Sequence, residues 1–366
     1  MAFEKIIGQQ KLVKALRRAL KQGRIHHGYL FYGNPGTGKE AVAIELAKSM
    51  LCQSGEDEAC NRCADCMRIA NLKHPDLIYI FPVAGSMQPD EEQMIIESLV
   101  KNPYRRANLW ANPSISIEKI RALRRTTAIK SFENKGRVII IADAHKMTQE
   151  AANALLKTLE EPPDRTHLIL TTSFINQLLP TIISRCQLIR FDNLSVEDIE
   201  KALIEREKVD RDRARVISRI SFGNYRRALD LIEDDLQLKR EQALNVLRTV
   251  LRTHYERIVL VENLIKDNEK VHLRELLEMI LLWFRDALIY SAWHEKAEIE
   301  DKIVNLDQID TLNKFVTACP NIDFEKAIFE IENAIGLIDR NVNTKLILIV
   351  LFDNLRQVMR RTSNVR

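Results

Sequence analysis

A glycine-rich stretch that ends in lysine is the first pattern with recognisable chemistry. Residues 33–39 read Gly-Asn-Pro-Gly-Thr-Gly-Lys, between a predicted strand at 29–32 and a predicted helix from about 39 to 51. This context suits a P-loop, because backbone N–H groups and a helix N-terminus can surround phosphate oxygens. The alternative is a plain turn with a chance lysine. The predicted nucleotide-binding residues of this stretch are Gly33, Gly36, Thr37, Gly38 and Lys39.

The residue after the lysine does not fit that pattern. A P-loop needs Ser or Thr there, since the hydroxyl binds Mg²⁺, but this chain has Glu40. A carboxylate repels a triphosphate and competes with it for the positive end of the helix. It also stabilises the first helical turn, so a site that no longer handles Mg-nucleotide could accept it.

A second acidic position shows a second departure. The apolar run 138–142 leads into Asp143, as in a Walker B strand, and Asp143 is a further predicted nucleotide-binding residue. An active ATPase of this kind has glutamate next, to orient the attacking water, whereas here Ala144 follows. We interpret the neighbouring His145 as structural. Two departures together favour a protein that binds nucleotide weakly or not at all and does not hydrolyse it.

Four of the six cysteines fall in one short stretch. Cys52, Cys60, Cys63 and Cys66 are spaced C-x7-C-x2-C-x2-C. Four thiolates so close together suit a closed tetrahedral Zn²⁺ site, which leaves no position for a catalytic water. An iron–sulfur cluster and free reduced cysteines are the alternatives. We therefore predict structural zinc.

The elements that must position these residues alternate along the first half of the chain. We expect strands at 29–32, 76–81, 137–143, 166–172 and 187–191, and helices at 3–24, 39–51, 116–130 and 148–159. Alternation of this kind predicts a parallel, doubly wound sheet. Residues 82–115 cannot be placed. A small helical region over 195–238 and several amphipathic helices over 240–366 follow, so the expected class is α/β plus all-α.

Composition restricts the function classes. The 366 residues leave room for two or three domains, and 55 basic against 51 acidic residues give a net charge of only +4. Nucleic-acid binding must therefore come from local clusters, such as Arg121, Arg124 and Arg125, which could equally be a solvated face. The N-terminus does not read as a secretion signal and the apolar runs are too short to span a bilayer, so we expect a cytoplasmic protein.

Two longer stretches carry a resemblance to a family. Residues 143–163, which contain Asn-Ala-Leu-Leu-Lys-Thr-Leu-Glu-Glu-Pro-Pro, and 170–186, which end in Ile-Ser-Arg-Cys, closely resemble bacterial clamp-loader subunits of the AAA+ family. The resemblance covers 3–230 and is weaker over 240–366. An acid-alanine pair at 143–144 is similar to the delta-prime branch of this family, whereas the gamma/tau branch keeps the threonine and the glutamate.

The resemblance implies three domains: an AAA+ P-loop NTPase-like domain at 1–192 with a zinc module at 52–66, a helical lid at 193–239 and a helical collar at 240–366. The collar would join this chain to gamma/tau and delta subunits in a heteropentameric ring that loads a sliding clamp onto primed DNA, without sequence preference.

The resemblance also assigns roles to three further residues. Arg185, in Ser184-Arg185-Cys186, corresponds to the arginine finger, which stabilises charge at a neighbour's ATP site. A local salt bridge is the alternative. Thr172 corresponds to sensor 1 and Arg226 to sensor 2.

Three hypotheses follow, and whether the chain is itself an enzyme stays open among them. The first is a ring subunit of the DNA polymerase III clamp loader that does not hydrolyse ATP and supplies Arg185 in trans. The second is an active gamma/tau-like ATPase that uses Lys39 and Asp143. The third is a P-loop small-molecule transferase, against which the zinc cluster and the missing Mg²⁺ hydroxyl argue.

Overall fold

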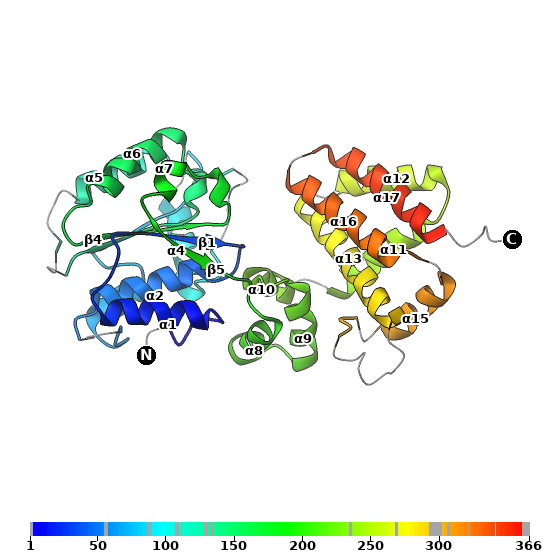
Figure 1. Ribbon diagram of the computed structural model, residues 1–366, viewed down its shortest axis with the longest axis horizontal. Helices are drawn as coiled ribbons and strands as arrows, with labels where there is room; N and C mark the ends of the chain where they lie inside the picture. The colour runs from blue at the N-terminus through cyan, green and yellow to red at the C-terminus, as the bar shows by residue number, and fades with distance from the viewer. Residues whose placement is uncertain are drawn as a thin grey trace. The chain divides into compact units, whose positions relative to one another are not determined.

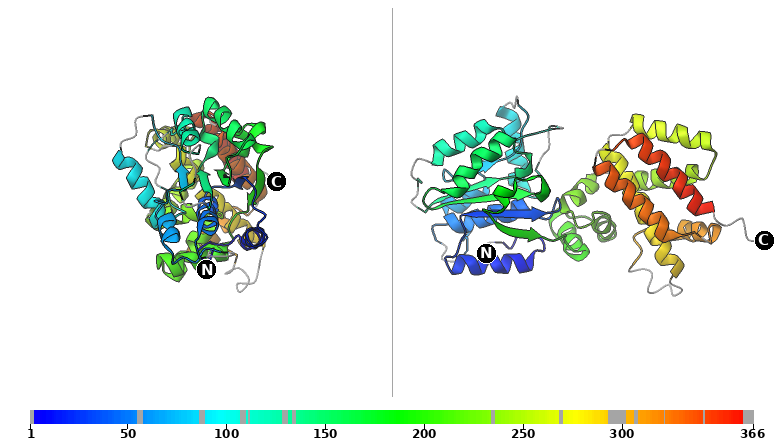
Figure 2. Two further views of the ribbon diagram at one scale, coloured as in Figure 1. Left: turned by 90° about the vertical axis from the view of Figure 1, so that its left-hand side faces the viewer. Right: turned by 45° about the horizontal axis from the view of Figure 1, so that its top comes forward.

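The structure is a computed structural model and contains two compact units (Figures 1 and 2). The units are Met1–Ile232 and Glu233–Arg366. Described residues are 3–54, 58–85, 89–106, 110, 112–127, 131–132, 135–233, 236–267, 270–292, 302–305, 308–320, 322–340 and 342–360.

A five-stranded parallel sheet forms the centre of the first unit. Its strands are β1 (Gly28–Gly33), β2 (Leu77–Ile80), β3 (Arg137–Ile141), β4 (Thr166–Thr172) and β5 (Gln187–Phe191), in the order β2-β3-β4-β1-β5. All five predicted strands are confirmed, with boundaries shifted by at most two residues. The strand after which the predicted phosphate loop begins, β1, lies between β4 and β5.

Helices cover both faces of this sheet (Figure 1). They are α1 (Gln10–Lys21), α2 (Lys39–Leu51), α3 (Ala64–Ala70), α4 (Pro89–Lys101), α5 (Ile117–Thr127), α6 (Gln149–Glu160) and the short α7 (Pro180–Ile183). In Figure 1, α1 and α2 lie below the sheet and α5 and α6 above it. Along β1, Phe31 packs with the α1–α2 side while its neighbour Leu30 packs with the α5–α6 side. Because successive residues of a strand point to opposite faces, β1 needs apolar residues at every position.

The structure changes the helix assignment of four segments. The predicted helix 3–24 is wrong over 3–9 and 22–24, since α1 spans Gln10–Lys21 and begins after Gln9 adopts a left-handed backbone with φ 54°. Helix α3 lies partly inside the segment read as a cysteine loop, and α4 lies inside the unplaced stretch 82–115. The helix predicted at 116–130 spans Ile117–Thr127, and residues 128–130 lie outside the described residues.

Three helices follow the sheet within or at the end of the first unit. They are α8 (Val196–Glu207), α9 (Arg211–Ile220) and α10 (Tyr225–Glu233). The side chains of Ser195 and Asp210 cap α8 and α9 by accepting hydrogen bonds from the first-turn N–H groups. This is the helical region that the sequence predicted after the last strand.

The second unit is helical throughout its described residues. Its long helices are α11 (Leu236–Val250), α12 (His254–Asp267), α13 (Lys270–Ala292), α15 (Ile309–Ala318), α16 (Phe324–Asp339) and α17 (Thr344–Arg360). The α/β plus all-α class is thus confirmed, while the division into three domains stays a prediction. Among the described helices, none combines the length and the apolar character needed to cross a membrane.

Candidate functional site: a closed phosphate loop and an exposed arginine

The glycine-rich loop connects β1 to the N-terminus of α2, as the sequence predicted. Gly38 is the N-cap of α2 and has a left-handed backbone with φ 91°. A Cβ atom at Gly38 would lie 2.9 Å from a ring carbon of Tyr104, and one at Gly36 would lie 1.7 Å from Oδ1 of Asn224. Side chains from other parts of the chain therefore lie directly against the loop, and only glycine fits at these two positions.

The two side chains expected near phosphate are instead bonded to the loop itself. The Thr37 hydroxyl, which is fully buried, donates to the carbonyl oxygen of Asn34 at 2.9 Å. The Lys39 ammonium donates to the carbonyl oxygens of Gly33 at 2.7 Å and Asn34 at 2.6 Å. Burial lowers the pKa of Lys39 to about 8, against the opposing effect of nearby Asp143. The Thr37 hydroxyl and the Lys39 ammonium thus both donate hydrogen bonds to carbonyl groups of the loop.

Arg106 joins the two acidic positions of the predicted Mg²⁺ site. Its guanidinium lies 3.1 Å from a carboxylate oxygen of Glu40 and forms an ion pair with the carboxylate of Asp143. The Tyr79 hydroxyl donates a hydrogen bond to Glu40. Only 11% of the Arg106 side chain is exposed, with 19% for Glu40 and 21% for Asp143. The guanidinium therefore forms a partly buried bridge between the first turn of α2 and the end of β3.

Burial and neighbouring charges shift the pKa values of Asp143 and Tyr79. Burial alone would raise the pKa of Asp143, but the Arg106 cation, with smaller contributions from His145 and Lys146, holds that pKa below its usual range. Burial raises the pKa of Tyr79, and the Glu40 carboxylate raises it further, so the hydroxyl keeps its proton and can donate it. The Lys39 ammonium and the Arg106 guanidinium thus lie beside the Glu40 and Asp143 side chains.

The hydrolytic positions are occupied by groups that face the protein. Ala144 is fully buried in the core on the α5–α6 side of the sheet. The predicted sensor Thr172 is also fully buried, and its hydroxyl oxygen lies 3.1 Å from Nδ1 of His145 and accepts a hydrogen bond from the backbone of Phe174 at 3.0 Å. Ala144 and His145 thus provide no carboxylate that could orient a water molecule.

A small cavity remains beside the loop, with a volume of about 70 Å³. The start of α10 closes it from one side, because the backbone N–H of Tyr225 donates to the Gly36 carbonyl at 3.1 Å. Ligand pockets usually measure roughly 300–1,000 Å³. The cavity brings together the predicted residues Gly36, Gly38, Lys39, Asp143 and Arg226, and it is also lined by Pro35, Glu40, Pro103, Tyr104, Arg106 and Ser173.

Sequence reasoning missed three contributors to this site. Tyr79 was seen only as part of a strand, and Tyr104 and Arg106 lie in the stretch that could not be placed. Tyr104 is buried, accepts a hydrogen bond from the Ile7 backbone at 2.8 Å and packs edge-on against Tyr225. One signal in the sequence could have indicated Arg106. Two carboxylates in one pocket, Glu40 and Asp143, require a positively charged partner, and an arginine with no other predicted role is a candidate for it.

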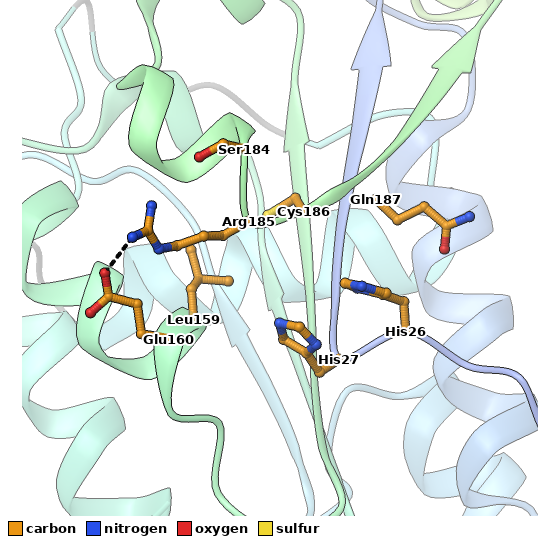
Figure 3. A pocket seen from close by; sticks show the side chains of 8 residues that line it. All are labelled: His26, His27, Leu159, Glu160, Ser184, Arg185, Cys186 and Gln187. Carbon is orange, nitrogen blue, oxygen red and sulfur yellow. Dashed lines mark ion pairs between the residues drawn. The ribbon is translucent and has the colours of Figure 1, made fainter.

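Arg185 lies in a different and larger depression (Figure 3). It follows α7, directly before β5, and the depression has a volume of about 620 Å³. Its lining residues are His26, His27, Leu159, Glu160, Ser184, Arg185, Cys186 and Gln187, and none of them lines the small cavity beside the phosphate loop. Arg185 therefore does not line the cavity beside the predicted phosphate loop.

The Arg185 guanidinium is held by exposed partners. It lies 2.7 Å from a carboxylate oxygen of Glu160 at the end of α6 (Figure 3). It also donates a hydrogen bond to the Thr181 carbonyl at 3.0 Å. The two side chains of the ion pair are 36% and 46% exposed, so solvent screens the pair and its net contribution is small. Burial raises the pKa of the adjacent Cys186 to about 11, which keeps this thiol neutral.

The four predicted metal ligands converge. The sulfur atoms of Cys52, Cys60, Cys63 and Cys66 all lie within 4.8 Å of one another. Two of the pairs, Cys52–Cys63 and Cys60–Cys66, are 3.9 Å apart. A tetrahedron with Zn–S bonds of about 2.3 Å has S···S edges of about 3.8 Å. The donor set therefore fits Zn²⁺.

Local hydrogen bonds favour a thiolate at Cys60, whereas burial raises the pKa of Cys66. The hydroxyl of Ser54, which lies 3.2 Å from the Cys60 sulfur, is the largest contributor to lowering the pKa of that thiol to about 5. The backbone N–H groups of Arg62 and Cys63 point at the same sulfur at 3.4 and 3.3 Å. Because zinc binds the deprotonated sulfur, these donors prepare a ligand.

Known proteins give the chain its relatives. The sequence signature of the family described as "DNA polymerase III, delta subunit" matches residues 8–195. DNA polymerase III subunit delta' of Bacillus subtilis is 30% identical over 340 residues, which span 92% of this chain and 93% of that protein. Subunit tau of Bacillus subtilis is 28% identical over 90% of this chain but 61% of its own length. For tau of Escherichia coli, with 28% identity, the shares are 71% and 40%.

A parallel sheet whose first strand leads into a glycine-rich loop and a helix N-terminus, with helices following the sheet, defines a P-loop NTPase fold of the AAA+ type. Within that class, the chain belongs to the DNA polymerase III delta subunit family.

Proposed function

We propose that this chain is a delta-prime-like subunit of the DNA polymerase III clamp loader, which helps to load a sliding clamp onto primed DNA. It does not hydrolyse ATP itself. Its catalytic contribution is Arg185, which reaches the ATP site of a neighbouring gamma/tau-type subunit. The partners are gamma/tau and delta subunits in a heteropentameric ring in the cytoplasm.

One observation carries the proposal. The pocket that should hold Mg-nucleotide contains a Glu40–Arg106–Asp143 ion-pair bridge where a P-loop enzyme holds Mg²⁺, and Ala144 stands at the position of the water-orienting glutamate. At the same time, the Arg185 side chain is 36% exposed and separate from that pocket. A guanidinium in such a place is free to meet phosphate oxygens of another subunit.

Turnover assays on the chain and on the assembled ring test this proposal. The purified chain should hydrolyse no ATP above the rate of its Lys39→Ala variant, with or without primed DNA. In a ring reconstituted with gamma/tau and delta subunits, Arg185→Ala should impair clamp loading while the ring still assembles. Arg190→Ala on β5 is a matched control, because its side chain is 73% exposed and pairs only locally with Asp192. Brisk Lys39-dependent hydrolysis by the chain alone would contradict the proposal.

We also propose structural zinc in the four-cysteine cluster, and sequence-independent contact with DNA through exposed arginines of α5. Arg121, Arg124 and Arg125 are all exposed on that helix. Metal analysis should give one zinc per chain, and Cys63→Ser should abolish it. Replacing the three arginines by glutamine should weaken DNA binding by the ring equally for different sequences.

A second candidate function has one observation in its favour. Subunit tau of Bacillus subtilis matches 90% of this chain at 28% identity, so an active gamma/tau-like ATPase is the nearest alternative. The same turnover assay decides between the two. The third hypothesis, a small-molecule transferase, gains no support from these relatives.

A further inference from the structure

The bridge across the phosphate loop has a consequence beyond the proposed function, on which it rests. In P-loop proteins a hydroxyl of the loop and the Walker B aspartate hold Mg²⁺ between them. Here Glu40 takes the place of the hydroxyl, and Arg106 lies between Glu40 and Asp143. The cation that these two acidic residues face is therefore part of the chain.

The contacts of Arg106 suit this role. A guanidinium is planar, stays charged and presents several N–H donors, so one side chain can pair with two carboxylates at once. Its two terminal nitrogen atoms contact different partners, since Nη1 pairs with Glu40 and Nη2 with Asp143. Tyr79 adds a hydrogen bond to Glu40 from β2. The bridge thus ties the phosphate loop to two strands of the sheet.

Charge balance within the pocket disfavours the binding of Mg-nucleotide. Lys39 and Arg106 contribute two positive charges, and Glu40 and Asp143 contribute two negative charges. The Lys39 ammonium also donates hydrogen bonds to the carbonyl groups of Gly33 and Asn34. A nucleoside triphosphate would have to displace these hydrogen bonds and would still lie beside the Glu40 carboxylate.

We propose that Arg106 is a built-in substitute for the divalent cation, and that its two ion pairs, rather than the residue at position 40 alone, keep nucleotide out of the loop. Restoring a threonine at position 40 then leaves the pocket closed, because Arg106 still pairs with Asp143. Removing Arg106 as well reopens the space between the loop and Asp143 for Mg²⁺.

Four forms of the full chain, three variants and the unaltered protein, test this inference, with Mg²⁺ and a fluorescent ATP analogue as the probe. They are Glu40→Thr, Glu40→Thr/Arg106→Gln, Glu40→Thr/Arg105→Gln, and the unaltered chain. Arg105 is the matched control, because it lies next to Arg106 but faces Asp230, at 3.9 Å, instead of the loop. Melting temperature and zinc content verify that each variant folds.

The expected result is that Glu40→Thr/Arg106→Gln binds the probe at least about tenfold more tightly than either Glu40→Thr or the Arg105 control, and that chelation of Mg²⁺ removes the gain. Equal binding by the two double variants, at any affinity, overturns the role of Arg106 but leaves the proposed function intact. Hydrolysis by the unaltered chain overturns both.

If Glu40→Thr/Arg106→Gln fails to fold, the charge-balanced pair Glu40→Gln/Arg106→Gln and Glu40→Gln/Arg105→Gln replaces it. Glutamine keeps the length of the Glu40 side chain and can still accept the Tyr79 hydrogen bond, and Glu40→Gln/Arg106→Gln removes one charge of each sign at the bridge. The same comparison then applies: tighter Mg-dependent binding only in the Arg106 variant supports the inference, and equal binding overturns it.

Discussion

The two arginine sites of this chain have opposite surroundings. Arg106 is 11% exposed and pairs with two carboxylates beside a cavity of about 70 Å³, whereas Arg185 is 36% exposed and pairs with one carboxylate at the edge of a depression of about 620 Å³. A buried pair is costly to break, because the partners are left charged and unsolvated, but an exposed pair exchanges readily. The first arginine is thus suited to holding its own pocket shut, and the second to changing partners.

The largest expected effect concerns Arg185. In the reconstituted ring, Arg185→Ala should lower single-turnover ATP hydrolysis at the one site that receives this side chain by roughly 10³-fold or more, the range known for arginine fingers. Arg185→Lys should restore little of it, because an ammonium keeps the charge but loses the planar fork. Rapid-quench measurements on rings with a single active ATPase subunit give this rate. If the ring with Arg185→Ala hydrolysed ATP at the wild-type rate, Arg185 would not act at a neighbouring ATP site, and the functional contrast with Arg106 would be lost.

Next in size is the stability change on removing Arg106. Arg106→Ala leaves Glu40 and Asp143 largely buried without their cation, which should lower the free energy of unfolding of the first unit by about 3–5 kcal/mol. Urea denaturation followed by a probe in the sheet measures this. Arg105→Ala, whose ion pair is exposed, should cost less than about 1 kcal/mol and serves as the control. Equal losses in the two variants would mean that the bridge is no stronger than a surface pair.

The closed loop also predicts a pH dependence. Because burial lowers the Lys39 pKa from 10.5 to about 8, the unfolded chain binds more protons than the folded chain between these values. Stability should therefore rise with pH across this window, by an amount on the order of 1–3 kcal/mol. The measurement is the difference between wild type and Lys39→Met, since other titrating groups affect both alike. A difference that stays constant from pH 7 to pH 10 would argue that Lys39 is solvated rather than folded onto the loop.

The smallest effect is expected at Glu160. Glu160→Gln breaks the exposed pair with Arg185 and should change stability by less than about 1 kcal/mol. It should alter ATP hydrolysis in the ring by at most about fivefold, since Arg185 only exchanges one partner for another. Glu161→Gln, at the neighbouring exposed position, is the control. A large loss of ring activity with Glu160→Gln alone would show that Arg185 needs this carboxylate to hold its position.

Sequence-based prediction succeeded where the interacting residues are close together in the sequence. Strand β1, the glycine loop and helix α2 are adjacent in sequence, so a local pattern was sufficient to place them. The four cysteines lie within fifteen residues, and their convergence could be read from spacing. The start of α1 was wrong because the left-handed Gln9 interrupts a pattern that otherwise reads as helical.

The sequence by itself determined the alternation of strands and helices, a carboxylate at position 40 where a P-loop has a hydroxyl, the absence of a carboxylate at Ala144 and the close spacing of four cysteines. These are properties of residue type and short spacing. Only the tertiary structure decided which cation lies between Glu40 and Asp143, because Arg106 and Asp143 are 37 residues apart and meet only when the chain packs around the sheet. It also decided that Arg185 and the phosphate loop line different cavities, because β5 pairs in parallel with β1, which puts the start of β5 and the end of β1 at opposite edges of the sheet.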